Sequence, residues 1–120
     1  MITVEALQEF FDRTRQLYNE GKAPFDIDGS CRWSFFFVDS DKEKLTQVGL
    51  HLENNGYEVI GFLEPSPEDE DQETIFLRAD RIETHSVDSL NQRNQELYKV
   101  AEHFEVLDYD GMDVGAVDGL

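Results

Sequence analysis

Residues 31–38, CRWSFFFV, constrain the fold more than any other stretch of this chain. The aromatic residues favour an extended strand, and side chains alternate between the two faces of a strand. The alternation gives two largely apolar faces, which consist of Trp33, Phe35 and Phe37 on one side and Ser34, Phe36 and Val38 on the other. A strand that is apolar on both faces is typical of the middle of a sheet whose two faces are covered.

Apolar periodicity and turn signals predict six more elements. In chain order, the expected elements are a helix at 3–20, the strand at 31–38, a helix at 40–55, strands at 57–63 and 74–82, a helix from 85 or 86 to 104, and a short strand ending at Tyr109. We expect Thr3 to cap the first helix, and Ser40 with Glu43 to form a capping box for the second. In strand 57–63, strict alternation puts Tyr57, Val59 and Leu63 on one face and Ile60 and Phe62 on the other.

After the first helix the order is strand, helix, strand, strand, helix, strand, which predicts an α+β ferredoxin-like sandwich. Right-handed crossovers place the four antiparallel strands in the order 4-1-3-2, with both crossover helices on one face. The N-terminal helix is then the candidate cover for the second face. We expect one domain over 1–120, with a helix and connector at 1–30, the core at 31–113 and a tail at 114–120.

The segment at 97–111, LYKVAEHFEVLDYDG, reads as the end of an amphipathic helix, a short strand and a turn. Leu97, Val100 and Phe104 recur at helical spacing, so we expect Phe104 to be buried at the end of the apolar stripe. The run Tyr109-Asp110-Gly111 is a turn signal, and Gly111 is expected to have a positive φ angle.

This helix-strand-YDG ending resembles the regulator of ribonuclease activity B family, the bacterial inhibitors of ribonuclease E. The resembling residues are Val100-Ala101-Glu102-His103-Phe104 through Tyr109-Asp110-Gly111, Gly56-Tyr57-Glu58-Val59, Thr84-His85-Ser86 and Ser89-Leu90-Asn91. The resemblance covers 31–113, and departs from the family pattern at Met112, where a Trp is usual, and in lacking a long acidic C-terminal tail. It implies the same sandwich and a non-catalytic regulator whose target is ribonuclease E.

The chain is strongly acidic, with 27 Asp plus Glu against 10 Lys plus Arg and a net charge of −17. Such a field opposes binding to naked nucleic acid and favours a basic protein partner, although acidity also serves solubility alone. The expected partner-binding residues are the acidic connector, Glu68, Asp69, Glu70 and Asp71, and the turn Asp108, Tyr109, Asp110 and Gly111.

We predict no catalytic residue, no cofactor and no metal site. Cys31 lacks a surrounding nucleophile motif, and His51, His85 and His103 are far apart without metal-ligand spacing. The acidic residues beside Gly29 and Gly111 fall short of a calcium loop. The N-terminus has no signal-peptide pattern and no apolar run approaches a membrane span, so we expect a cytoplasmic protein and no membrane partner.

Other functions remain open from the sequence. A small acidic protein of this kind could be an immunity-type protein that neutralises a cognate toxin, or a small enzyme with a polar cleft at His85 or Cys31. An RNA-recognition domain shares the predicted strand order and stacks bases on sheet aromatics such as Trp33 or Phe76. The basic-Gly-aromatic signature of those domains is absent from 74–82, and the net charge argues against them.

Overall fold

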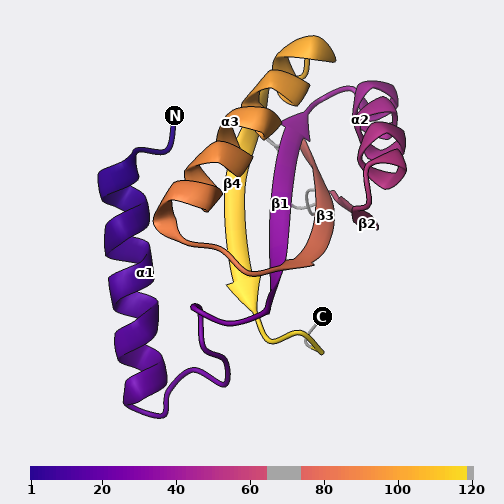
Figure 1. The fold of residues 1–120 in the computed structure, drawn as a ribbon. Helices are drawn as coiled ribbons and strands as arrows, with labels where there is room; N and C mark the ends of the chain where they lie inside the picture. Colours follow the sequence, from indigo (N-terminus) through magenta and orange to yellow (C-terminus); the bar gives the residue numbers. More distant parts are fainter. Residues whose placement is uncertain (65–73, 119–120) are drawn as a thin grey trace.

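The computed structural model describes residues 1–64 and 74–118. Within these residues the chain forms three helices and a four-stranded antiparallel sheet (Figure 1). The helices are α1 (Val4–Asn19), α2 (Lys42–Asn54) and α3 (Val87–His103). The strands are β1 (Cys31–Asp39), β2 (Glu58–Leu63), β3 (Ile75–Glu83) and β4 (Asp108–Gly115). The element order is the one that the sequence predicts.

The sheet has the order β2-β3-β1-β4, which is the predicted order read from the other edge. In register, Phe35 of β1 lies opposite Ala79 of β3 on one side and Met112 of β4 on the other. The strand at 31–38 is therefore central, as its two apolar faces indicate. β2 and β4 form the two edges.

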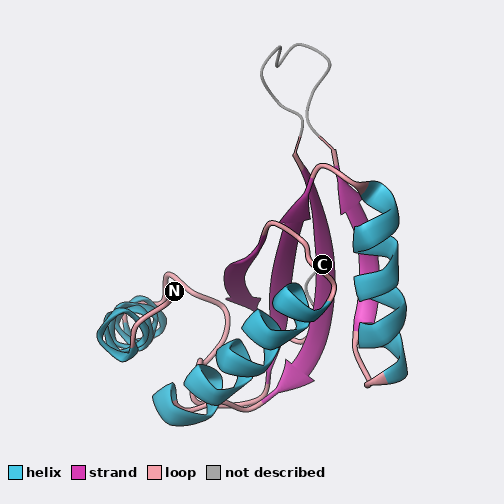
Figure 2. Ribbon diagram, turned by 90° about the horizontal axis from the view of Figure 1, so that it is seen from above, coloured by secondary structure: helices cyan, strands magenta, loops and turns pink. Residues whose placement is uncertain are grey.

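All three helices lie on the sheet face that carries Trp33, Phe35 and Phe37, and these three side chains are fully buried. The N-terminal helix α1 packs beside α3 and stacks Phe11 on Trp33, with ring centroids 6.1 Å apart. Figure 2 shows α1 at one side of the molecule next to α3, with α2 at the other. The expectation that α1 covers the second face is therefore wrong, because its apolar residues pack on the same face of the sheet as α2 and α3.

The predicted cap of the first helix is confirmed, the predicted cap of the second is wrong, and the third helix starts after Ser86 rather than His85. Thr3 and Ser86 are the N-caps of α1 and α3, and each accepts a hydrogen bond from a backbone N–H of the first turn. In α2 the cap is Asp41, not Ser40, and it accepts from Glu43 N at 2.9 Å. The buried carboxylate of Asp39 accepts from Asp41 N at 2.7 Å, which holds Ser40 in the turn before the helix.

Two β-bulges change the predicted strand patterns. In β2 the register shifts between Val59 and Gly61, so Ile60 is an extra residue, and Val59 and Phe62 face the same way against α2. The predicted alternation is therefore wrong beyond Val59, and Leu63 is 53% exposed.

The YDG run lies inside β4 and is not a turn at the end of a strand. The register with β1 shifts between Phe36 and Phe37, so Asp110 is the extra residue of a second bulge. Gly111 has φ +124°, which confirms the expected positive angle but places it in a strand. The chain reverses earlier, at Glu105, which has φ +56° and follows the end of α3.

Phe104 is only partly buried, contrary to the expectation that it closes the apolar stripe inside the core. It is the C-cap of α3, and its ring packs between those of His51 and His103 near the surface. The buried residues of α3 are Leu90, Asn94, Leu97 and Ala101.

None of the helices in the described part of the chain has the length and apolar composition that crossing a bilayer requires.

Candidate protein-binding face

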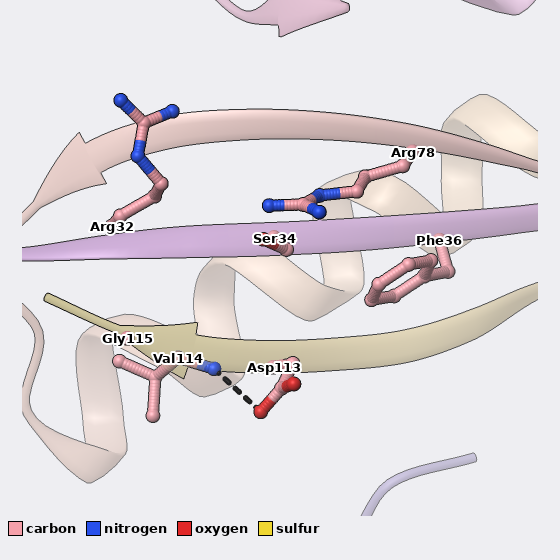
Figure 3. Close-up of a pocket in the computed structure, with 7 residues that line it drawn as sticks. All are labelled: Arg32, Ser34, Phe36, Arg78, Asp113, Val114 and Gly115. Atoms are coloured by element: carbon pink, nitrogen blue, oxygen red, sulfur yellow. Dashed lines mark hydrogen bonds between the residues drawn. The ribbon is translucent and has the colours of Figure 1, made fainter. Parts of the chain in front are cut away.

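The sheet face opposite the helices carries charged and apolar side chains and is covered by no helix of the described chain. Its central row consists of Arg32, Ser34, Phe36 and Val38, which alternate with the buried aromatic row of β1. Figure 3 shows Arg78 lying between β3 and β1, Phe36 on the other side of β1 toward β4, and Asp113 on β4. These side chains border a shallow hollow of about 370 Å³.

Asp80 anchors this face. It is 1% exposed, and Arg78 donates to both of its oxygens at 2.9 Å while Arg32 donates at 3.1 Å. Burial on its own raises the pKa of Asp80, but hydrogen bonds from Arg78, Ser34 and Arg32 outweigh it, so the pKa is lowered. The carboxylate therefore stays ionised and pairs with both guanidinium groups.

Apolar side chains flank this ionic centre. Phe36, Val38 and Phe76 are partly exposed, and Ile82 is 48% exposed. A face that mixes half-exposed apolar side chains with fixed charges is typical of a surface that contacts another protein.

The edge strand β4 carries an exposed row of carboxylates, Asp108, Asp110 and Asp113. We call these three residues the acidic edge. After Lys99 the sequence contains six Asp or Glu and no Lys or Arg, so no basic side chain from this part of the chain neutralises the row. Asp113 also accepts a hydrogen bond from Val114 N at 2.8 Å. Asp113 lies close enough to Arg78 to interact with its charge, whereas Asp108 and Asp110 form no ion pair with a described residue. Unpaired carboxylates on a strand edge discourage pairing with like strands and attract basic segments.

The four residues of the YDG region have different roles. Asp108 and Asp110 are exposed and free to meet a partner, whereas Gly111 is buried and Tyr109 is 1% exposed. Tyr109 donates from its hydroxyl to the buried Asn94 side chain at 2.7 Å, and its ring contacts Phe37 and Tyr98. Burial raises the pKa of Tyr109, so the hydroxyl remains a donor. Tyr109 and Gly111 fix the strand, and the two aspartates project from it.

The acidic connector, Glu68, Asp69, Glu70 and Asp71, lies outside the described residues.

Several other parts of the site had no signal that sequence reasoning could use. Arg32 and Asp80 lie on different strands and are 48 positions apart in the sequence, so no local pattern indicates that they pair. Asn94 has the sequence pattern of an ordinary polar helix residue, although its side chain is buried. An Asp within an otherwise half-apolar central strand is the one feature at which a buried ion pair could have been suspected.

The residues weighed for catalysis do not form one cluster, because His51 and His103 flank Phe104 while Cys31 and His85 lie elsewhere. Cys31 is fully buried and donates from its Sγ to the Asp26 carbonyl, and burial, with the nearby carboxylates of Asp26 and Asp28, raises the pKa of its thiol. His51 and His103 are exposed, as expected for solvated helix residues, whereas His85 is buried against Trp33. In the described part of the chain, no three His, Cys, Asp or Glu side chains are grouped to hold a metal ion.

The fold and this face define a small α+β sandwich with helices on one side, an open sheet face on the other, and an acidic strand at one edge. The family model for the regulator of ribonuclease activity B matches residues 11–114, and the chain belongs to that family. The match runs from the middle of α1 almost to the end of β4, so it includes every element that builds the face. The comparison with curated proteins gives no match.

Proposed function

We propose that this protein binds a ribonuclease E-type enzyme and lowers RNA processing without catalysing a reaction itself. The observation that supports this function best is the acidic edge, an exposed row of carboxylates on a rigid strand. Family membership supplies the class of target, because the family regulates ribonuclease activity. The net charge of −17 makes a basic protein segment the complementary partner.

The mechanism is occlusion of a basic segment that otherwise holds RNA. Arginine and lysine side chains that contact RNA phosphates pair equally well with carboxylates. Asp108 and Asp110 supply such carboxylates at β4, and the connector Glu68, Asp69, Glu70 and Asp71 adds four more acidic groups. When the protein occupies the segment, RNA loses its binding site and cleavage slows, although the enzyme's own active site is untouched.

An RNA-cleavage assay with a purified ribonuclease E-type enzyme tests this function. The cleavage rate is expected to fall as the protein is added, and the protein alone should leave the RNA intact. A triple variant, Asp108→Asn, Asp110→Asn and Asp113→Asn, keeps the side-chain shapes and should need a much higher concentration for the same inhibition.

A matched control removes three exposed carboxylates elsewhere, through Glu5→Gln, Glu9→Gln and Glu53→Gln. This control should inhibit nearly as well as the natural chain. Undiminished cleavage at saturating protein would overturn the proposed function. Equal losses in the two triple variants would instead show that net charge acts without the acidic edge.

A further inference from the structure

A groove between α2 and α3 gathers basic side chains in a chain that is otherwise strongly acidic. Two hollows, of about 200 and 260 Å³, adjoin there and share His51 and Val100. Figure 1 looks onto the sheet between these two helices, which stand on either side of β1 and β3. Arg81 and Arg93 line the inner hollow and Lys99 lines the outer one, so three of the chain's ten Lys and Arg meet in one groove.

The two arginines are held at the inner end of the groove by shared partners. Both guanidinium groups lie over the ring of Tyr57, at 5.1 Å for Arg81 and 5.7 Å for Arg93. Glu83 accepts a hydrogen bond from Arg93, forms an ion pair with Arg81 Nε at 3.0 Å, and lies within hydrogen-bond distance of His85 Nε2. One carboxylate thus orients two permanent cations, whose side chains remain 34% and 21% exposed. The other carboxylate near Arg93 is Glu96, which is itself largely exposed.

The outer end combines donors with an aromatic wall. His51 and His103 are exposed, and their rings contact Phe104 with centroids 5.5 and 4.8 Å away. Lys99 has no hydrogen bond or ion pair with any other described residue, so its ammonium group is available. Ligand sites typically have this composition, an apolar wall with a few well-placed polar groups.

The hollow on the open sheet face is larger but suits an anion less well. Both of its arginines, Arg32 and Arg78, are bound to Asp80, and Glu58 lies 3.6 Å from Arg32. Asp113 borders the same hollow. Three carboxylates there outnumber two guanidinium groups, whereas in the helical groove the three cations Arg81, Arg93 and Lys99 face two carboxylates, Glu83 and Glu96.

We propose that the α2–α3 groove binds a small organic anion, a carboxylate or phosphate carried on a flat apolar body. The anionic group would meet Arg81 and Arg93, with the apolar body along Val100 and Phe104. Charge complementarity favours this occupant, because the surrounding acidic surface repels large polyanions while a small anion can enter the basic groove. The inference concerns a second site and does not depend on ribonuclease binding.

The test is an NMR titration of the whole protein with phenyl phosphate and, separately, benzoate, at constant ionic strength. Inorganic phosphate and phenol supply the anionic group and the apolar body alone. Phenyl phosphate or benzoate should shift backbone resonances of α2, α3 and β3, and the ring resonances of His51 and His103, in a saturable way. Dissociation constants in roughly the millimolar range are expected for ligands of this size. Phosphate and phenol should each bind more weakly.

Lys99→Gln and Arg13→Gln form a matched pair, since each removes one exposed helix cation that pairs with no described residue. Lys99→Gln should weaken phenyl phosphate binding about threefold, as for an exposed charge pair, and Arg13→Gln should leave it unchanged. Arg81→Gln should weaken binding about tenfold, because it removes a charged hydrogen-bond donor. Equal effects of Lys99→Gln and Arg13→Gln, or shifts that never saturate or that scatter over the surface, would overturn the proposal.

Discussion

Tyr109 donates its buried hydroxyl to Asn94, whose side chain is itself fully buried. Tyr109→Phe keeps the ring but leaves the Asn94 oxygen without this donor, so it should cost about 2 kcal/mol of unfolding free energy. Tyr18→Phe, at an exposed position on α1, should change stability by less than about 0.5 kcal/mol. Urea denaturation of both variants measures the difference, and a neutral Tyr109→Phe would show that the buried hydrogen bond contributes nothing.

Asp80 gives the stability of the domain a specific pH dependence. Its folded-state pKa lies below the ordinary value of 3.8, so the unfolded chain takes up a proton first as the pH falls. Its stabilising contribution is therefore complete above about pH 4 and is lost as the pH falls through the folded-state pKa. Asp80→Asn should cost about 3 kcal/mol at neutral pH, because Arg32 and Arg78 lose their shared counterion.

The same variant should differ less from the natural chain at acidic pH. Denaturation midpoints measured from neutral pH down to about pH 3 follow this convergence. A gap between Asp80→Asn and the natural chain that stays constant over that range would contradict the assigned role of the carboxylate.

At the scale of the element, the bulge in β4 depends on Gly111. Its φ of +124° is strained for any residue with a side chain, and an added Cβ would lie 3.6 Å from Ile2 Cδ1. Gly111→Val should therefore destabilise the domain by about 2 kcal/mol. Gly115→Val is the control in the same strand, because its Cβ would meet no atom within 4 Å and its φ is ordinary. Similar midpoints for the two variants in thermal denaturation would refute the role of the bulge.

The order of elements and the central position of β1 were predictable from sequence. Apolar residues recur every 2 residues in a regular strand and every 3.6 residues in a regular helix, so regular elements can be recognised from their pattern. The bulges were not predictable, since one inserted residue, Ile60 or Asp110, reverses the facing of everything after it. The same effect made YDG look like a turn: the pattern of Asp and Gly is shared by turns and by bulges.

Long-range contacts limited prediction of the site more than local patterns did. Nothing near Asp80 in the sequence indicates that Arg32 donates a hydrogen bond to it. The groove between α2 and α3 depends on how these two helices pack on the sheet, which local sequence patterns do not specify. Phe104 illustrates the same limit. It continues the apolar spacing of α3, but it is the C-cap of that helix and is only partly buried. The acidic character of β4, by contrast, could be read directly from the sequence.

For the whole molecule, the charges are unevenly placed. The acidic edge lies on β4, while Arg81, Arg93 and Lys99 line the groove between α2 and α3. A partner that approaches the edge would be attracted over a distance set by screening, about 8 Å at physiological ionic strength. Association driven by such a field accelerates at low salt and slows steeply as salt rises.

We expect the acidic connector to attract a basic partner in the same way. Replacing Glu68, Asp69, Glu70 and Asp71 with Ser should therefore flatten the salt dependence of the association rate without unfolding the domain.

The most direct test of the central claim is the association rate with a ribonuclease E-type enzyme, measured across a salt series. The natural chain should associate quickly at low salt and slow markedly as salt is added. The triple variant Asp108→Asn, Asp110→Asn and Asp113→Asn should associate more slowly at low salt and depend less on salt, and the two curves should converge at high salt. Identical rates for both proteins at every salt concentration would contradict the claim that the acidic edge receives the partner.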